Sequence, residues 1–459
     1  MMITKLKEYI DTIIQFYQTH EKTINRTLLF LLVIFIFRKI VIHLRYRRNK
    51  DKSIAVIGTG PSGLLMTRML NKKGYKNISL YGNFGENQVN TIIKDGIHID
   101  TNACFFHAGY DNSVYKLCKE YKMDVETLDS YDFGYNKNNK LFIKKYEDDN
   151  YSMIDLIKFA YHSICCSIFK NITNSYNITA LEYAKKHNMK WIFNQLFANG
   201  QLYGFLDNVS AYHLFEWYKP STLFSLVFNF KIRGKYIISK GYEILFDKIF
   251  RDLKIKDYND VKIKKVIKDK DTNKLTLIDE SGNEIQKDKV LVCCPSIYLD
   301  TPIKEIIDTD TDIEYTKVFI LCFTADKESP IGTFYEKHYL TEGYRNKITA
   351  FRYFGTDKDG KHLYKALGYM SFDITETELK EKVLLEIREK LRLEVFDIFY
   401  WKIHNYNIRF TTKALRQNKH KNCRNIQGKD NIWYSSGPFN HWDIDSIYEY
   451  NQKLINKYF

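Results

Sequence analysis

The stretch SIAVIGTGPSGLLMTRMLNKKGYKNISLY, from Ser53 to Tyr81, decides the fold. It reads as an apolar, β-branched strand, a glycine turn, a helical stretch and a second strand, which together make a βαβ unit. The turn carries Gly58, Gly60 and Gly63 in the pattern G-x-G-x-x-G. The first glycine permits a tight turn, the second lets the backbone approach a pyrophosphate, and the third allows close packing of helix on strand. The pattern therefore predicts a dinucleotide-binding site.

The flanks of the turn favour this interpretation over a coincidental glycine turn. Pro61 and Ser62 follow the second glycine, and a helix that begins with them would direct its N-terminus at phosphate. The second strand fits less well, because an acidic residue normally ends it and binds the ribose hydroxyls. Here Gly82 takes that place, and the nearest carboxylate is Glu86 in the following loop. Losing such a charge-assisted hydrogen bond costs about 1.5 to 3 kcal/mol, which weakens a cofactor site without abolishing it.

Three later segments continue the pattern. GIHIDTNACFFHAGYDNSVYKLCKEY begins at Gly96, ISKGYEILFDKIFRDL at Ile238, and NIWYSSGPFNHWDIDSIYEYNQKLINKYF at Asn431. With the glycine turn, these segments resemble the flavin-dependent amine oxidase family, in the family's order and over most of the chain from Ser53 onward. The resemblance implies FAD as the cofactor. It implies contacts from Asp100 and Ala103 before a flavin-facing turn, from the backbone of Val266 to the adenine, and from Gly437 to the phosphates.

The order of the motifs implies an α/β fold with two interleaved domains. We expect a Rossmann-type FAD-binding domain made of residues 51–103, 236–298 and 423–459, and an inserted α+β substrate domain made of residues 104–235 and 299–422. The sequence departs from the family at Gly82, at the segment FGENQVN, which lacks the second glycine pair and its arginine, and at Pro438, where an acidic residue is common. Either the remaining backbone groups hold FAD, or the site has become a scaffold.

Few catalytic side chains are expected, because the flavin ring itself accepts the hydride. The segment EYTKVFILCF, from Glu314 to Phe323, is similar to the family's strand whose lysine holds a water near the reactive nitrogen of the flavin. Lys317 is therefore the catalytic candidate, and the alternative is a surface lysine.

Aromatic side chains are expected around the substrate, because they desolvate an amine and hold its neutral form. The candidates are Tyr203, Phe205, Trp433 and Trp442, and the alternative is that they are core residues. The twelve histidines show no H-x-x-x-H spacing, so no metal site is expected.

Composition excludes several other classes of protein. The 459 residues carry a formal net charge of +15, but no zinc-finger, helix-turn-helix or RNP-like pattern accompanies it, so no nucleic-acid partner is expected. The eight cysteines form no C-x-x-C pair, which disfavours a zinc or thioredoxin-type site. Reduced thiols in the cytosol are the simplest interpretation.

The N-terminal region predicts a membrane anchor. The stretch TLLFLLVIFIF, residues 27–37, is uncharged and almost wholly apolar, and residues 40–44 continue it after Arg38 and Lys39. A membrane span needs about twenty helical residues, so residues 27–44 would form a single-pass helix with those two side chains reaching the headgroups. Seven basic residues against one acidic between Arg38 and Lys52 place the large domain on the cytosolic side. The alternatives are an interfacial helix or a buried one; residues 1–26 form a further short segment.

These observations together predict a membrane-anchored, FAD-dependent oxidoreductase. It would act on a C–N or similar C–H bond of a small molecule such as an amine, pass a hydride to flavin and use oxygen as the final acceptor. Two alternatives stay open. The chain could be a non-catalytic membrane protein that keeps the Rossmann scaffold to bind a partner, or an NAD(P)-dependent enzyme, because Gly82 removes the carboxylate that would repel a 2′-phosphate.

Overall fold

The computed structural model describes most of the chain after residue 49. The described residues are 15, 50–84, 89–102, 106–107, 112–128, 130–135, 141–145, 153–168, 178–189, 205–217, 235–269, 274–295, 299–328, 334–336, 345–435, 437–439 and 443–459. The predicted anchor at residues 27–44 lies outside them, as does the preceding segment apart from Gln15. Among the described residues, no helix is long and apolar enough to cross a membrane.

A parallel sheet of five strands carries the glycine turn. Its order is β10 (Asp257–Asn259), β2 (Ile78–Tyr81), β1 (Ile54–Ile57), β14 (Lys289–Val292) and β20 (Ile432–Tyr434). All four strand pairings are parallel. Helix α2 (Pro61–Lys72) connects β1 to β2, so the predicted βαβ unit is confirmed. The sheet assembles strands that lie far apart in the sequence.

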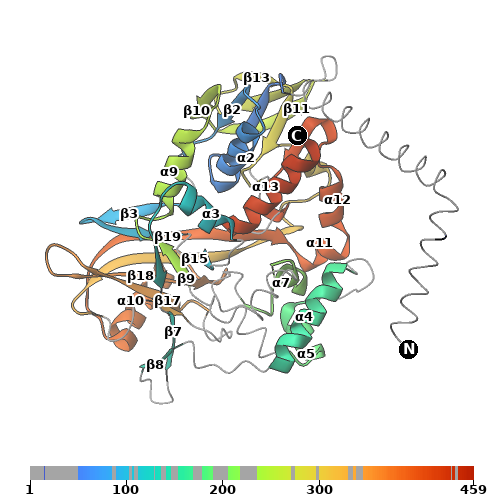
Figure 1. Cartoon of the computed structure of the whole chain (residues 1–459). Helices are drawn as coiled ribbons and strands as arrows, with labels where there is room; N and C mark the ends of the chain where they lie inside the picture. Colours follow the sequence, from blue (N-terminus) through green and yellow to red (C-terminus); the bar gives the residue numbers. More distant parts are fainter. Residues whose placement is uncertain are drawn as a thin grey trace.

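Both faces of this sheet are buried. Successive side chains of each strand point to opposite faces, and each face packs against its own layer. Ile54 and Val56 pack with helices α2, α3 (Ser113–Glu120), α9 (Tyr242–Asp252) and α13 (Ile444–Tyr458). Ala55 and Ile57 pack in a second cluster that includes the antiparallel strands β11 (Ile263–Lys268) and β12 (Leu275–Asp279), and β13 (Glu284–Lys287) pairs with β12. Figure 1 shows the helical layer beside the parallel sheet.

A second, larger sheet lies below the first in Figure 1. Its seven strands follow the order β19 (Val395–Phe410), β15 (Ile313–Ala325), β18 (His362–Met370), β17 (Ile348–Thr356), β16 (Phe334–Glu336), β7 (Ser130–Tyr135) and β8 (Leu141–Lys145). On β15, Phe319, Leu321 and Phe323 face helix α10 (Glu376–Glu386). Val318, Ile320 and Cys322 face the opposite way and pack with Ile99 and Phe205. This opposite side is called the inner face below.

Smaller elements join the two sheets. They are the hairpin β3 (Thr91–Lys94) and β4 (Ile97–Asp100), and the sheet β5 (Phe106–His107), β9 (Lys235–Ile238) and β6 (Val125–Leu128). Five helices lie together at one side: α4 (Met153–Ile168), α5 (Ala180–Lys186), α7 (Ala211–Trp217), α11 (Thr412–Arg416) and α12 (Lys419–Asn425). Short helical turns occur elsewhere: η5 (Pro302–Glu305), η7 (Ile387–Leu391), η8 (Lys429–Asn431) and η9 (Gly437–Phe439). The mixed α/β fold is as predicted; the domain boundaries given above stay a prediction.

Candidate cofactor and active site

The glycine turn follows β1 and leads directly into α2. Gly58 has a φ of +115°, and a Cβ there would lie 2.8 Å from the backbone nitrogen of Cys294. A Cβ on Gly63 would lie 1.7 Å from the carbonyl oxygen of Gly58. Both positions therefore require glycine, for the tight turn and the close helix packing that the motif predicts.

The first turn of α2 has no competing anion. Gly60 is the N-cap and makes no side-chain capping bond, Pro61 opens the helix, and no acidic residue lies in the first turn. The amides at this N-terminus are thus set up to bind a phosphate group, since partial positive charge accumulates there.

The C-terminal segment is fastened to this turn through Ser62. The Ser62 hydroxyl donates to the backbone oxygen of Ser435, just after β20. The Asn451 amide on α13 donates to the backbone oxygen of Ser62 at 2.8 Å and its oxygen bonds the Ser435 hydroxyl. Gly437 follows with a φ of +56°, a left-handed conformation that favours glycine. The network brings Gly437 and the α2 N-terminus to the same edge of the sheet.

The predicted departure at the ribose position is visible in the structure. Gly82 directly follows β2 with a φ of +132°, and a Cβ there would meet Thr59 at 3.4 Å. Its amide donates to Asn259 on the neighbouring strand β10 at 3.1 Å. Its carbonyl accepts from the Tyr258 hydroxyl at 3.1 Å, and the described residues place no carboxylate at this point. Glu86 lies outside the described residues.

Val266 lies in β11 and its side chain is buried. Its amide donates to the backbone oxygen of Asp300 at 2.9 Å. The backbone contact to adenine that the family resemblance implies could not use this amide, because the protein already engages it.

Asp100 is buried at the end of β4 and holds the start of α9. Its Oδ1 accepts hydrogen bonds from the Thr91 hydroxyl at 2.6 Å and the Tyr242 amide at 3.0 Å. A Cβ on Gly241, which precedes α9 at a φ of +87°, would come within 2.8 Å of the same oxygen. Burial raises the pKa of Asp100 to about 6, against the opposing hydrogen bonds and the nearby charges of Lys365 and Arg352. Asp100 therefore organises the turn through its carboxyl group. Ala103 lies outside the described residues.

Lys365 brings a buried amine to the inner face of the large sheet. It lies on β18 opposite Cys322, is 3 % exposed, and donates from Nζ to the backbone oxygen of Asp100 at 2.6 Å. Lys365 thereby links the large sheet to the hairpin that carries Asp100.

Further polar groups surround this link. The Tyr400 hydroxyl contacts the His404 ring at 3.2 Å. Burial, together with the charges of Lys402 and Lys365, lowers the pKa of His404 to about 4, so its ring is neutral at pH 7. Nδ1 of His98 and Oδ1 of Asn102 are buried and have no hydrogen-bond partner among the described residues. Buried polar atoms of this kind normally find a partner in the protein, in water or in a ligand.

Lys317 lies on the other side of the large sheet. It belongs to the same alternating set as Phe319, which faces α10, and its Nζ lies 4.7 Å above the ring of Phe372. Phe372 itself is 66 % exposed. Lys317 is therefore half-buried at the outer face, whereas Lys365 is buried on the inner face.

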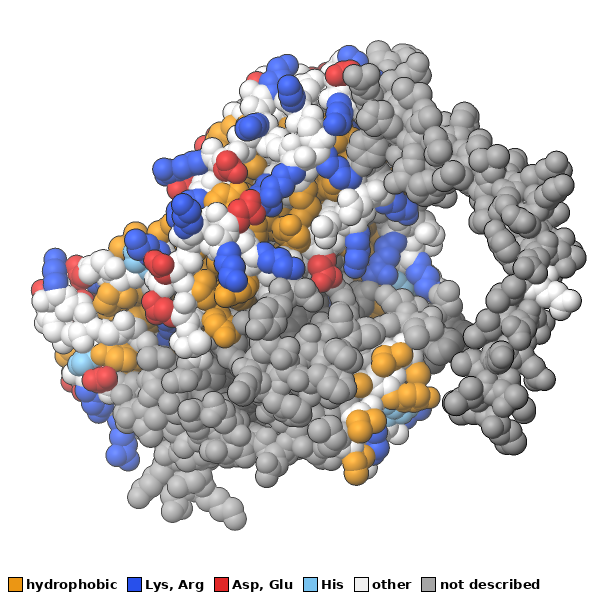
Figure 2. Space-filling model, viewed as in Figure 1, with side chains coloured by type: hydrophobic (Ala, Val, Ile, Leu, Met, Phe, Trp, Pro, Cys, Tyr) orange, Lys and Arg blue, Asp and Glu red, His pale blue; other side chains and the backbone are white. Residues whose placement is uncertain are grey.

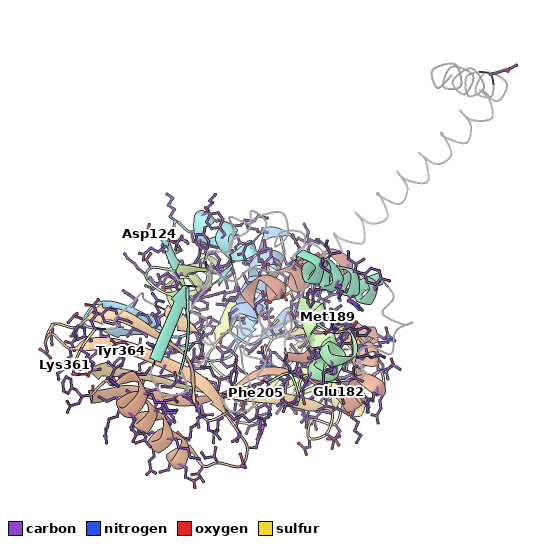
Figure 3. The ribbon with its side chains drawn as sticks, turned by 90° about the horizontal axis from the view of Figure 1, so that it is seen from below. Asp124, Glu182, Met189, Phe205, Lys361 and Tyr364 are labelled. Atoms are coloured by element: carbon purple, nitrogen blue, oxygen red, sulfur yellow. The ribbon has the colours of Figure 1, made fainter. Side chains whose placement is uncertain are left out.

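Of the four aromatic candidates, Phe205 lies on the inner face. Its ring is 5.4 Å from that of Tyr369, and the Arg345 guanidinium lies over it at 4.8 Å. Arg345 is in turn paired with Asp207 at 2.7 Å. Figure 3 shows Phe205 beside the strands of the large sheet. Phe205 thus lines the same face as Lys365.

Trp433 has the surroundings of a core side chain. It lies in β20, is 4 % exposed, and its ring is 4.8 Å from that of Phe459 at the end of α13. It packs in the helical layer of the parallel sheet, away from Phe205 and the inner face. Tyr203 and Trp442, the other two aromatic candidates, lie outside the described residues. Among the described residues, no cluster of three or more His, Cys, Asp or Glu could hold a metal ion.

Comparisons with known proteins address the fold. No family model matches the sequence, and no curated protein matches it either. Solved structures do match. A CLA-producing fatty acid isomerase from P. acnes superposes with a TM-score of 0.73 at 14% identity, covering 89% of this chain and 99% of the isomerase. Wild-type putrescine oxidase bound to putrescine gives 0.64 at 11% identity, covering 88% and 98%. A putative protoporphyrinogen oxidase from Exiguobacterium gives 0.60 at 14%, also covering 88% and 98%. The chain therefore has the fold of the FAD-dependent amine oxidases, as its motifs predict.

Proposed function

We propose that the chain binds FAD and acts as an amine-oxidase-like oxidoreductase. The observation that carries the proposal is the glycine turn, where Gly58 and Gly63 have no room for a side chain and lead into an uncapped helix N-terminus. The fold shared with putrescine oxidase and the other oxidases supports the same cofactor. The pyrophosphate side of the site fits a dinucleotide well. The ribose side fits less well, because the Gly82 amide already bonds Asn259 and its carbonyl already accepts from the Tyr258 hydroxyl.

The residues of the chain would divide the work between the two ends of the cofactor. The α2 N-terminus and the backbone at Gly437 would bind the phosphates, with Ser62 holding the two segments together. Bound FAD would supply the hydride acceptor. His98 and Asn102, in the segment around Asp100, would offer its reactive end buried polar atoms that have no hydrogen-bond partner among the described residues.

Lys365 is the residue that we assign to the position next to the reactive end. Its Nζ, which is held by a hydrogen bond to the Asp100 carbonyl, would orient a water or a substrate. Its charge disfavours a second cation nearby, so an amine would enter in its neutral form. Phe205 and Tyr369 would exclude water from the substrate. The substrate we propose is therefore a small amine, with oxygen as the final electron acceptor.

The test is a reductive titration of the full chain without oxygen. Addition of a substrate amine is expected to bleach the visible absorbance of the bound flavin, and admission of air to restore it with release of hydrogen peroxide. NADPH in place of the amine is the comparison. Bleaching by NADPH alone would support the alternative NAD(P)-dependent enzyme, and a folded chain that takes up no FAD would favour the scaffold.

We also propose that residues 27–44 anchor the chain in a membrane. The support is the sequence alone: an apolar stretch followed by a basic cluster between Arg38 and Lys52, which favours a cytosolic position for the rest of the chain. Extraction of cell membranes with alkaline carbonate should leave the full chain in the membrane pellet. Its release into the supernatant would contradict a spanning helix.

A further inference from the structure

Helix α4 has two different faces. Phe159 and Ser163 are fully buried, and the ring of Phe159 lies 5.6 Å from that of Phe215 on α7. The opposite face carries large side chains spaced at i, i+3, i+7 and i+10, which places them on one side of a helix. These are Ile154, 67 % exposed, Ile157, 60 %, Tyr161, 64 %, and Ile164, 41 %. The helix thus presents a continuous apolar stripe, here called the α4 stripe.

The α4 stripe is unusual within the described part of the chain. The other exposed large hydrophobic side chains there are Ile93, Tyr258, Ile267, Phe372, Leu385 and Phe396, and no helix or strand carries more than one of them. Single exposed apolar side chains are normal on a protein surface, whereas a contiguous patch marks a contact surface. Figure 2 shows orange side chains gathered over α4.

Basic side chains border the α4 stripe. Lys158 is exposed within it, and Lys185 and Lys186 are exposed at the end of α5, where the His187 ring contacts the His162 ring of α4 edge-on, with 4.5 Å between the ring centres. The segment from Thr411 to Gly428, which forms α11 and α12, contains five basic residues and no acidic one: Lys413, Arg416, Lys419, Lys421 and Arg424.

Helix α7 joins the basic helices to α4. The Arg424 guanidinium donates to the Tyr212 hydroxyl on α7 at 2.8 Å, and the His213 ring contacts the backbone oxygen of Phe410 at 2.8 Å. Phe215 on the same helix packs against α4. Figure 2 shows blue side chains over α11 and α12 directly above the orange patch on α4. The apolar stripe and the basic helices therefore lie on one side of the molecule.

We propose that the α4 stripe and the basic helices α11 and α12 dock on the surface of an anionic lipid bilayer. An apolar helix face with cations beside it is the arrangement that binds in the interfacial region, where apolar side chains enter the acyl boundary and Lys or Arg contacts the headgroups. A protein partner would also need apolar contact, but α11 and α12 keep an excess of basic residues, although Lys419 pairs with Asp312 at 3.3 Å, and this excess complements lipid phosphate. The apolar residues 27–37 and the basic cluster after them are a second sequence feature that suits the same surface.

The docking proposal does not depend on FAD binding, and its test distinguishes docking of α4 from anchoring by residues 27–44. The experiment is hydrogen–deuterium exchange of the full chain, reconstituted in vesicles of phosphatidylcholine with or without phosphatidylserine, and read on the peptide Met153–Ile168. In vesicles with phosphatidylserine we expect amide exchange in this peptide to slow by about tenfold relative to the chain in detergent. Phosphatidylcholine alone should give a smaller effect.

Three sets of substitutions sharpen the test. Ile154→Ser, Ile157→Ser and Ile164→Ser together should abolish the slowing, and since all three side chains are exposed the variant should stay folded. The matched control, Phe372→Ser, Leu385→Ser and Phe396→Ser, removes as many exposed apolar side chains elsewhere and should leave the slowing intact. Lys413→Gln with Lys421→Gln should remove only the additional effect of phosphatidylserine.

Three results would overturn the proposal. The first is equal exchange in the Met153–Ile168 peptide with and without vesicles. The second is protection without lipid that the N-terminal variant Leu32→Lys with Ile36→Lys removes, which would mean that the chain's own apolar segment covers α4. The third is protection that rises with protein concentration in the absence of lipid, which would indicate a second copy. Loss of the anchor alone would appear as release from vesicles and not in these exchange patterns.

Discussion

Nζ of Lys365 lies 2.6 Å from the backbone oxygen of Asp100, and this contact joins the large sheet to the hairpin β3–β4. The lysine is 3 % exposed, while the carboxyl group of the same aspartate holds the start of α9. One residue pair thus connects the large sheet to the segment that the family resemblance places beside the flavin.

Lys365→Met is expected to slow flavin reoxidation and amine turnover by at least about tenfold, because it removes the buried cation that we assign to the reactive end. It should also lower the free energy of unfolding by about 1 to 3 kcal/mol, since the Asp100 carbonyl loses a buried donor. Stopped-flow reoxidation and denaturant titration measure the two effects. Lys317→Met is the matched control on the outer face of the same sheet and should change neither quantity by much. A large reoxidation defect in the control with none in Lys365→Met would reverse our assignment.

Asp100 predicts a specific dependence of stability on pH. Its pKa is raised from 3.8 to about 6 in the folded protein, so the folded state holds its proton more tightly than the unfolded state. The contribution to stability is therefore complete below about pH 4 and is lost as the pH rises through about 6, amounting to about 3 kcal/mol. Denaturant titrations of wild type and Asp100→Asn between pH 4 and 7 should show the wild type losing stability relative to the variant. A constant difference across that range would mean that Asp100 titrates normally.

Gly63→Ala should reduce FAD retention by at least about tenfold, because the new Cβ would lie 1.7 Å from the carbonyl oxygen of Gly58 and must displace the turn. The measurement is the flavin content of the purified full chain. Gly282→Ala is the control: it introduces a side chain at a φ of +87° with nothing within 4 Å, so it tests the cost of losing a glycine far from the turn. That control should keep its flavin. Equal retention in both variants would argue against a pyrophosphate at the turn.

Much of the fold was predictable from local sequence. The strand, turn and helix from Ile54 to Lys72 follow from apolar β-branched residues, three glycines at fixed spacing and Pro61 at the helix start, and all of these signals are short-range. The lack of a carboxylate just after β2 was equally predictable from the sequence, because Gly82 directly follows the strand.

The active-site side chains were harder to predict, because they depend on which face of a strand they occupy. A shift by one residue moves a side chain to the other face of a sheet, and the sequence around Lys317 does not reveal that Phe319 faces α10. Lys365 had a weak signal, a charged residue between apolar neighbours in HLYKALGYM, but its partner Asp100 lies far away along the chain. Trp433 is near a predicted phosphate contact in sequence, yet it packs against Phe459 in the core.

The central claim is that this chain holds FAD at the turn formed by Gly58, Gly60 and Gly63, and identification of the cofactor in the purified full chain tests it most directly. We predict the visible absorbance bands of oxidised flavin and, after denaturation, release of close to one FAD per chain. A folded, colourless chain that gains no flavin absorbance after incubation with excess FAD would contradict the claim.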